Sequence, residues 1–407
     1  MSVDTFDIVL TLIRKSINPS DTEQITVADW DSLFNELSTQ GISAISADLL
    51  AQMVPASEKR RLIQAVSVSL MTMHKHLEAQ DSLGRLYQEK GIPFVILKGL
   101  AVSRYYPKPE YRSLGDIDIA VLHADYEAAR QAMLQDGYRE VKSHYEKHGV
   151  FEKNGLVFEL HKYFASANDV KKASFIEEQI QNGIMSPVIC ELKGYRFPVL
   201  PPTADGIMLL EHMSQHLEDG IGLRHMMDWM LYVSHELNDA AWQNGFRDAA
   251  AAAGLCRLAE VSTKLCVRYL GLRGISWCDT TDEEACDRLL AHVKDRGNFG
   301  HKSAAPSSKA QKLLSIHKGI FYRFRYLQRT GLRIPFVAKH RILHPFAWLI
   351  RAFVLVSQYL KGGNTVLDLR QEYEKAKEIE SFMDDLGIRR VSRGHTFWNG
   401  SSFVMKK

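Results

Sequence analysis

Hydrophobic residues in the first 90 positions recur every three or four places, a spacing that predicts helices. The runs "DTFDIVLTLIRKS" and "ITVADWDSLFNELSTQG" both show it, and the second ends at Gly41, a suitable helix C-cap. A longer run extends from Glu58 to Lys90 and closes at Gly91. We therefore expect an N-terminal helical region over residues 1–75, whose last helix continues to about residue 90.

The pattern changes after residue 91 to short runs rich in β-branched and aromatic residues. These runs are "IPFVIL", "DIDIAVL", "GYREV", "GVFEKN" and "LVFELHKYF", and a helical run, "ADYEAARQAMLQDG", separates the second from the third. This order predicts an α+β fold with a small mixed β-sheet, which we place at residues 76–200. Helical spacing returns at about Thr203 and predicts a helical domain over residues 201–295.

Charge distinguishes the rest of the chain, residues 296–407. Between Arg296 and Leu367 the sequence has 13 Lys and Arg residues and no Asp or Glu, with aromatic residues interspersed. Three interpretations stay open: a solvated basic face, a contact with an anionic membrane surface, and a groove for RNA or a phosphorylated acceptor. A charged helix, "LRQEYEKAKEIESFMDDLG", is expected after this segment.

The cysteines and the apolar runs favour a cytoplasmic protein. The five cysteines are odd in number and include no CxxC pair, which favours a reducing compartment. Asp4 and Asp7 stand where a signal peptide carries positive charge. The most apolar segment, "PFAWLIRAFVLVSQYL", is short for a membrane span and has Arg351 in its middle. We expect a cytoplasmic location, with peripheral association at a membrane as the alternative.

The candidate chemistry begins with two acids on an otherwise apolar strand. Asp116 and Asp118 in "GDIDIAVL" are two positions apart, so their side chains share one face while Ile117 and Ile119 point into a core. Two carboxylates this close repel each other, and a divalent cation such as Mg²⁺ relieves the repulsion. The simpler interpretation is a half-exposed strand that carries two acids on its solvent face.

A third acid favours the interpretation with a cation. Glu159 in "LVFELHKYF" lies between two apolar residues, where an acid costs energy unless it is paired or ligated. Together, Asp116, Asp118 and Glu159 would form the three-carboxylate arrangement used in two-metal phosphoryl and nucleotidyl transfer.

Residues next to these strands are candidates for phosphate contacts. Lys98 and Gly99 end the strand "VIL" and precede a helix, whose N-terminal amides can face an anion. Arg112 and Ser113 stand at the entrance of the Asp-x-Asp strand, and a guanidinium in such a loop suits a phosphate. We expect all four residues to line a nucleotide site.

These motifs resemble the DNA-polymerase-beta-type nucleotidyltransferase superfamily, and within it a family of uncharacterised bacterial nucleotidyltransferase-like proteins. The resemblance rests on "LKG", "YYP", Arg112, "GDIDIAV", "DGY" and "FELH". It covers about residues 90–230, because "LLEHMSQH" and "GLRHMMDWMLY" are similar to that family's helical extension. The superfamily has a Gly-Ser turn before its Asp-x-Asp strand. Here the turn is Lys98-Gly99, and it lies farther from Asp116 than usual.

The resemblance implies a small mixed sheet with flanking helices and a Mg²⁺-dependent nucleotidyltransferase acting on an NTP. Asp116 and Asp118 would hold metal, with two Mg²⁺ ions expected, and Glu159 would be the third ligand or the base on the acceptor. Lys98 and Arg112 would offset triphosphate charge. Members of the superfamily modify proteins, RNA and small molecules, so the acceptor stays open. The alternatives are a catalytically inactive nucleotide-binding scaffold or sensor, and a phosphotransferase acting on a peptide or sugar.

Several histidines have open roles. His212 and His216 lie four apart on a predicted helix, a spacing that suits a metal, a polar contact near the site or simple packing. His225 and Asp228 on the next helix are placed to hydrogen-bond with them. His161 shares a strand face with Glu159, which suits a supporting role or a role toward the acceptor. We expect Tyr105 and Tyr106 either to pack inside the protein or to stack on a nucleobase.

Overall fold

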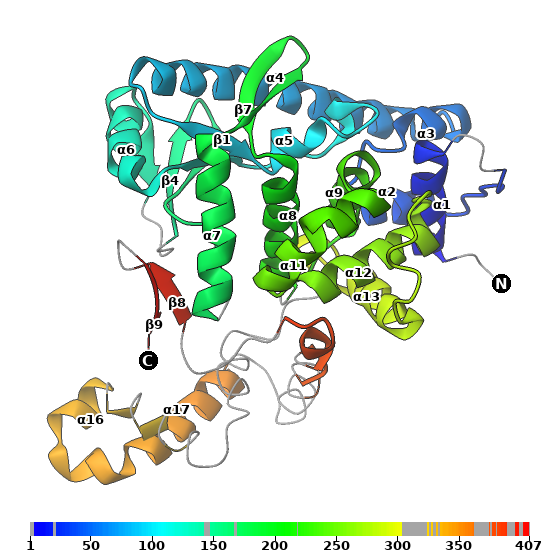
Figure 1. The fold of residues 1–407 in the computed structure, drawn as a ribbon. Helices are drawn as coiled ribbons and strands as arrows, with labels where there is room; N and C mark the ends of the chain where they lie inside the picture. Colours follow the sequence, from blue (N-terminus) through cyan, green and yellow to red (C-terminus); the bar gives the residue numbers. More distant parts are fainter. Residues whose placement is uncertain are drawn as a thin grey trace. The chain divides into compact units, whose positions relative to one another are not determined.

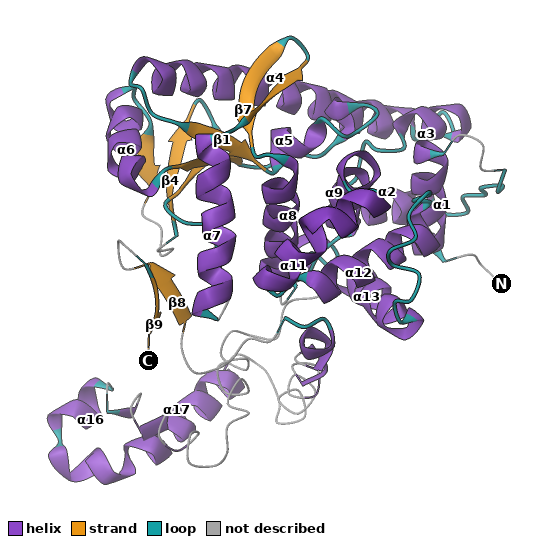
Figure 2. Cartoon of the chain, viewed as in Figure 1, coloured by secondary structure: helices purple, strands orange, loops and turns teal. Residues whose placement is uncertain are grey.

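The structure is a computed structural model of the 407-residue chain. It describes residues 4–18, 22–141, 147–166, 169–217 and 219–302, parts of 324–388, and residues 395–398 and 402–406. The chain forms two compact units, one of residues 1–303 with 386–407 and the other of residues 304–385. The first unit contains a β-sheet and most of the described helices (Figures 1 and 2).

A seven-stranded mixed sheet lies in the first unit, in the order β3-β4-β5-β2-β1-β7-β6. Strand β2 runs antiparallel to β1 and parallel to β5, while β1 runs parallel to β7. These directions place the end of β1 beside the beginning of β2. The strands are β1 (Phe94–Leu97), β2 (Ile117–Val121), β3 (Arg139–Val141), β4 (His148–Lys153), β5 (Leu156–His161), β6 (Val188–Leu192) and β7 (Tyr195–Val199).

The two faces of the sheet have different neighbours. Ile117, Ile119 and Val121 of β2 point into a hydrophobic core that includes residues of α4 (Lys59–Glu89) and α6 (Tyr126–Gln135). Asp118 lies between them in sequence and points to the opposite face, because side chains alternate along a strand. In Figure 1, α4 runs along the upper side of the sheet, and α7 (Val170–Met185) and α8 (Pro202–His216) extend below it. The acids of β2 therefore face away from the main core.

Helices from both ends of the first unit pack together beside α8. Helix α9 (Leu223–Glu236) contacts α8 and α12, and α12 contacts α13. The N-terminal α1 contacts α2, α3 and the helical turn Cys266–Leu270. Residues of the N-terminal region thus complete the packing of the helices that follow the sheet. The remaining helices are α1 (Thr5–Ile17), α2 (Trp30–Thr39), α3 (Ala47–Met53), α5 (Gly99–Ser103), α10 (Asp239–Ala241), α11 (Arg247–Ala253), α12 (Cys256–Leu265) and α13 (Glu283–Arg296).

Two buried ion pairs connect the segment between β1 and β2 to these helices. Arg112 donates to Asp228 of α9 through two nitrogen atoms, Nε to Oδ1 at 2.9 Å and Nη2 to Oδ2 at 2.7 Å. Both residues are buried. Arg104, which follows α5, donates to Asp205 of α8 at 2.9 Å. We call these two ion pairs, with the tyrosine contacts described next, the buried joint.

Two tyrosine hydroxyls complete the buried joint. The Tyr106 hydroxyl donates to Asp228 Oδ1 at 2.7 Å, and the Tyr105 hydroxyl donates to Glu236 Oε1 at 3.1 Å. Both rings are 4% exposed, so neither presents a face on which a nucleobase could stack. Of the two expectations for these tyrosines, packing is the one that the structure supports.

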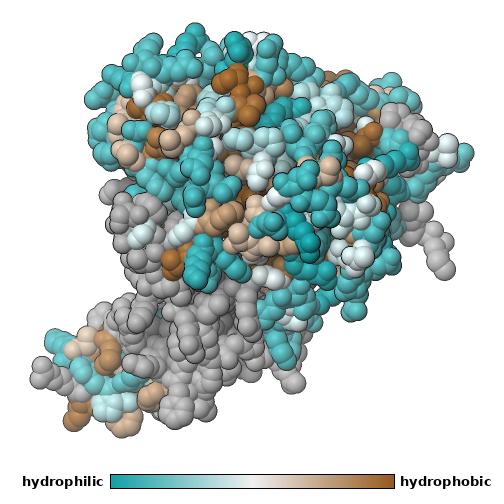
Figure 3. All heavy atoms as spheres, in the orientation of Figure 1, coloured by the Kyte–Doolittle hydropathy of each residue, from teal (hydrophilic) through white to brown (hydrophobic). Residues whose placement is uncertain are grey.

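The second unit contains α16 (Pro335–Lys339) and α17 (Ala347–Lys361). Large apolar side chains are exposed on its described part, which Figure 3 shows in brown. Much of the acid-free segment, for which a solvated basic face, a membrane contact and a groove for RNA or a phosphorylated acceptor were left open, lies outside the described residues. In the described part of the chain, no helix combines the length and the apolar character needed to cross a membrane.

Near the C-terminus, β8 (His395–Trp398) and β9 (Phe403–Lys406) pair as an antiparallel hairpin.

The predicted fold class is confirmed, because the sheet is mixed and helices flank it. The five predicted strand runs correspond to β1 to β5, and the predicted helices correspond to α4 and α6. The sequence analysis missed the hairpin of β6 and β7, which extends the sheet beyond β1. Its turn residues, Lys193 and Gly194, both have positive φ, which is typical of a two-residue type I′ turn. The dipeptide Lys-Gly between two apolar runs was therefore a usable signal.

The Arg112–Asp228 pair predicts a specific change in stability. Replacing Arg112 by Gln leaves the Asp228 carboxylate buried without its cation, and the free energy of unfolding should fall by about 3–5 kcal/mol. Urea denaturation followed by circular dichroism measures this change. The control is Arg268→Gln, because Arg268 forms solvent-screened ion pairs with Glu283 and Asp287 that are worth about 1 kcal/mol or less. Equal losses for the two variants would contradict the role given to the buried pair.

Candidate active site

The structure brings the three predicted acids together. Asp118 lies opposite Glu159 in the register of the parallel strands β2 and β5, and Asp116 immediately precedes β2. One carboxylate oxygen from each of Asp116, Asp118 and Glu159 lies within 4.8 Å of the other two. Side-chain alternation explains why the first two share a face, and the pairing of β2 with β5 supplies the third. This carboxylate cluster has the residue types and closeness that a hard divalent cation requires.

Lys98 places a cation beside the cluster. Its Nζ lies 2.7 Å from Asp118 Oδ1, and the residue has φ of 46° and ψ of −131°. A non-glycine residue with positive φ is strained, typically by about 1–3 kcal/mol, and such strain is often found at functional sites. The lysine thus adopts an unfavourable backbone conformation at the end of β1, where its ammonium group reaches the acids.

Two histidines flank the cluster from β4 and β5. His148 and His161 face each other in the antiparallel register, with ring centroids 5.1 Å apart. His161 Nε2 lies 2.8 Å from Asp118 Oδ1, and His148 Nε2 lies 3.3 Å from Glu159 Oε1. His148, Glu159 and His161 form a second group of closely spaced metal-ligand types, which shares Glu159 with the carboxylate cluster. The sequence analysis left His161 open between a supporting role, a role toward the acceptor and an ordinary polar residue at the end of a strand, and its contact with Asp118 is compatible with the first.

The surroundings of the three acids shift their pKa values in different directions. Burial favours the protonated form of Asp118, but Lys98 and His161 outweigh it and lower the pKa of this carboxyl. The charge of Asp118, followed by burial, raises the pKa of Asp116. Burial, followed by the charges of Asp118 and Asp116, raises the pKa of Glu159 to about 8. One acid is therefore firmly ionised, while Glu159 holds a proton at neutral pH until a cation compensates its charge.

The remaining predicted phosphate contacts differ in their surroundings. A Cβ atom at Gly99 would lie 3.8 Å from the backbone oxygen of Asp116, so Gly99 is close to the cluster. Arg112 Nη1 lies 3.3 Å from the backbone oxygen of Ser113. The other donors of Arg112 face Asp228, so its guanidinium forms a protein ion pair in this arrangement instead of facing open space.

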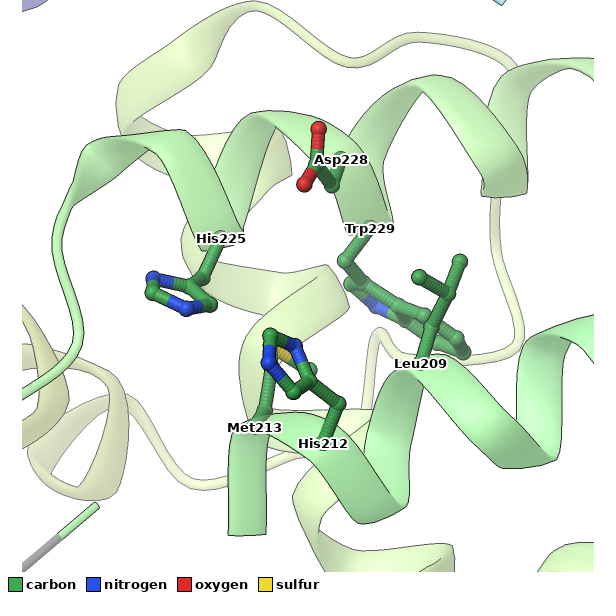
Figure 4. A pocket seen from close by; sticks show the side chains of 6 residues that line it. All are labelled: Leu209, His212, Met213, His225, Asp228 and Trp229. Atoms are coloured by element: carbon green, nitrogen blue, oxygen red, sulfur yellow. The ribbon is translucent and has the colours of Figure 1, made fainter. Parts of the chain in front are cut away.

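A histidine group lies between α8 and α9. The ring centroids of His212, His216 and His225 are 4.6 to 6.0 Å apart. Among the described residues these histidines belong to no group of metal-ligand atoms, so the metal role left open for His212 and His216 gains no support. A cavity of about 10 Å³ beside them is just large enough for one water molecule (Figure 4). Its lining consists of Leu209, His212, Met213, His225, Asp228 and Trp229.

Sequence analysis missed Arg224, the residue before His225. Its guanidinium lies over the Phe299 ring, 5.1 Å from the centroid. Burial, followed by the charge of Arg112, lowers the pKa of Arg224, while Asp228, Tyr106 and Asp116 act in the opposite direction. The signal was present in "GLRHMMDWM", where an arginine precedes the histidine and aspartate that were considered. Nothing in that local pattern indicates that Arg224 approaches the cluster on β2.

Comparison with known proteins identifies a family for this chain. The family described as "Uncharacterised nucleotidyltransferase" matches residues 26–271. No curated protein matches the chain. A crystal structure of an antigenic nucleotidyltransferase-like protein from Paracoccidioides brasiliensis aligns with 51% of this chain and 97% of its own, at 14% identity and a TM-score of 0.31. That structural similarity is too weak to carry an argument.

The family match, in contrast, spans more than half of the chain. It includes α4, the strands β1 to β7, the carboxylate cluster and the helices from α8 to α12. The chain therefore belongs to this nucleotidyltransferase family.

Proposed function

We propose that the protein transfers a nucleoside monophosphate from an NTP to an acceptor in a reaction that depends on a divalent cation. The observation that carries this proposal is the carboxylate cluster of Asp116, Asp118 and Glu159, in a member of a nucleotidyltransferase family. In such a reaction the acceptor oxygen or nitrogen attacks the α-phosphorus, and pyrophosphate leaves.

The side chains of the site divide the work. Asp116, Asp118 and Glu159 would hold Mg²⁺, which when bound polarises the phosphate and stabilises negative charge. Lys98, next to Asp118, adds a positive charge near the triphosphate. If Glu159 is instead the base on the acceptor, its pKa of about 8 suits that role. Gly99 and Ser113 remain proposed phosphate contacts. We assign Arg112 to the buried joint, because Asp228 occupies its guanidinium.

The identity of the cation is open to a direct test, because nitrogen atoms lie near the cluster. His148 and His161 share Glu159 with the acids in a second group of ligand types. Imidazole nitrogen suits Mn²⁺ or Zn²⁺ better than Mg²⁺, whereas carboxylates suit Mg²⁺ and Mn²⁺. The nucleotide screen should therefore include Mn²⁺ as well as Mg²⁺.

Two rival functions make different products. A phosphotransferase acting on a peptide or sugar would add a phosphate to its acceptor, and a nucleotidyltransferase would add a nucleoside monophosphate. Mass spectrometry of the modified acceptor separates them. An inactive nucleotide-binding scaffold would bind an NTP and leave no modified product. The buried contacts of Lys98 and His161 with Asp118 support an enzyme, since they keep one acid ionised at neutral pH.

A nucleotide screen tests the proposal. ATP, CTP, GTP and UTP are added with Mg²⁺ and, in a parallel series, with Mn²⁺. Thermal stability is measured for wild type, Asp116→Asn and the Asp116→Asn, Asp118→Asn double variant. One nucleotide at about 100 times its Kd should stabilise the wild type by about 2.7 kcal/mol, and the variants should lose this effect. The control is Asp248→Asn on α11, which removes an exposed acid far along the chain. Stabilisation that persists in both site variants would refute the assigned site.

Cation binding should depend on pH through Glu159. Below a pKa of about 8 this carboxyl holds a proton that the cation must displace, so Mg²⁺ affinity should rise by up to about tenfold per pH unit from pH 6 to 8. Calorimetry in two buffers of different ionisation enthalpy should detect proton release at pH 7. Glu159→Gln should bind more weakly without proton release. His148→Gln should keep the release, because burial lowers the pKa of His148 to about 4.

We also propose that the second unit contacts an anionic membrane surface. Five large apolar side chains in its described part are each half or more exposed, those of Phe336, Ile342, Phe346, Leu349 and Phe353. Leu349 and Phe353 lie four residues apart on α17 and so share one helix face. The surrounding sequence is basic and free of acids from residue 296 to 367, which complements anionic lipid.

Vesicle binding tests this surface. The protein should sediment with vesicles that contain roughly 30% phosphatidylserine and far less with neutral vesicles. The reason is that each basic residue near an anionic surface contributes about 1 kcal/mol to binding. Leu349→Ser with Phe353→Ser should weaken binding by about tenfold or more, since a buried apolar side chain contributes about 1.5–3 kcal/mol. The matched control is Val157→Ser, an exposed apolar residue of the sheet. RNA binding in a gel shift without vesicle binding would refute the membrane contact.

A further inference from the structure

Arg224 carries a cation that the protein itself does not neutralise. It is the second residue of α9, and within the described part of the chain its guanidinium makes no hydrogen bond or ion pair. The Nε atom is buried without a partner. A cation in such a position costs folding free energy, and groups that persist at such a cost are often functional. Arg224 therefore has the character of a binding residue.

The nearest carboxylate on the same helix is already occupied. Asp228 lies four residues after Arg224, but both of its oxygens accept from Arg112, and Oδ1 also accepts from Tyr106. Two arginines thus share the surroundings of one aspartate. The charge of Arg112 is balanced within the buried joint, and the charge of Arg224 remains for an external anion.

The Phe299 ring orients the guanidinium. Phe299 has φ of 53°, an uncommon value for an aromatic residue, and its amide donates to Gly220 O at 3.0 Å. A Cβ atom at Gly222 would lie 2.8 Å from Asn298 N, so the turn 297–300 packs directly on the chain before α9. The ring offers no hydrogen-bond acceptor, so the donors of the guanidinium stay available for two parallel hydrogen bonds to an anion.

The neighbouring His225 has an unpaired ring nitrogen of its own. Its Nδ1 accepts from the Gly222 amide at 3.3 Å, so in the neutral ring the proton resides on Nε2. Burial, followed by the charge of Arg224, lowers the pKa of His225, which keeps the ring neutral. The residue is 2% exposed, and its Nε2 has no partner in the described part of the chain. His225 also lines the small cavity of Figure 4, which has room for one water molecule and not for a phosphate, so this ring nitrogen is not a phosphate donor.

The backbone amides at the start of α9 are not the binding groups. Leu223 donates to Gln40 Oε1 at 2.9 Å, and Arg224 donates to Gln40 O at 3.2 Å. The next amide, that of His225, donates to Gly222 O. An anion here must therefore be bound by a side chain, and Arg224 is the candidate.

We propose that Arg224 binds a phosphate group of a substrate. This proposal rests on the proposed function, since nucleotidyl transfer supplies the phosphate-bearing substrates. The charge of Asp116 acts on the Arg224 guanidinium, so Arg224 lies within electrostatic range of the carboxylate cluster. The phosphate belongs either to the triphosphate of the nucleotide or to the acceptor, and the two sources give different binding results.

Binding of inorganic pyrophosphate without metal tests the site directly. Calorimetry with EDTA present should detect binding to the full-length wild type, and Arg224→Gln should weaken it by about tenfold or more, the value of a charge-assisted hydrogen bond. Arg268→Gln, a surface control on the same group of helices, should leave it unchanged. The Asp116→Asn, Asp118→Asn variant should bind pyrophosphate at least as well as wild type, because it removes nearby negative charge.

Nucleotide titrations with Mg²⁺ identify the source of the phosphate. If Arg224→Gln weakens the binding of ATP about tenfold and the binding of AMP less than about twofold, the residue binds the triphosphate. If Arg224→Gln binds ATP as tightly as wild type does, but the ATP-loaded variant no longer binds pyrophosphate while ATP-loaded wild type does, the residue binds a phosphate of the acceptor. The proposal is overturned if wild type binds no pyrophosphate, or if Arg224→Gln matches Arg268→Gln in every titration.

Two further results separate this proposal from others. The Arg224→Gln variant should melt no lower than wild type, because it removes an unpaired cation, so a weakened binding is not a folding defect. Unchanged Mg²⁺-dependent nucleotide binding in the Asp116→Asn, Asp118→Asn variant would refute the proposed cation site. It would leave a phosphate site at Arg224 standing if pyrophosphate binding still requires that arginine.

Discussion

Asp116, Asp118 and Glu159 repel one another, because their oxygen atoms lie within 4.8 Å. The surroundings answer this repulsion in two ways. Lys98, in a strained backbone conformation, and His161 stabilise one negative charge on Asp118. The other two acids have raised pKa values, so protonation relieves the rest of the repulsion. A divalent cation can replace those protons, which makes the unfavourable grouping of acids useful.

Local patterns predicted the parts of this site that depend on a single strand. Strand alternation placed Asp116 and Asp118 on one face, and the apolar neighbours of Glu159 indicated that this acid needed a partner. Local patterns do not reveal which distant residues meet. The partner of Arg112 is 116 positions away at Asp228, so a residue that looked ready for phosphate is engaged within the protein. Arg224 was missed for the same reason, because its lack of a partner is a property of the folded chain.

The two arginines near Asp228 show how similar side chains take different parts. Arg112 shares a fully buried, two-bond ion pair, and breaking it would leave a charge stranded in the interior. Arg224 has an aromatic ring beneath it and no carboxylate partner within the described chain. One arginine therefore contributes to the folded state, and the other detracts from it while remaining ready for a ligand. Their order in the sequence gives no indication of this difference.

The buried joint has a consequence for how substrates enter. Its two ion pairs and two tyrosine hydroxyls connect the segment between β1 and β2 to both α8 and α9. Separating the segment between β1 and β2 from α8 and α9 would break several of these polar contacts at once. Breaking each one is costly where water does not replace the lost partner. The acids and the helices facing them are thus held in register before any substrate arrives. Ligand association should then proceed in a single kinetic step, limited by diffusion into a preformed site and not by a slower closure of the two parts.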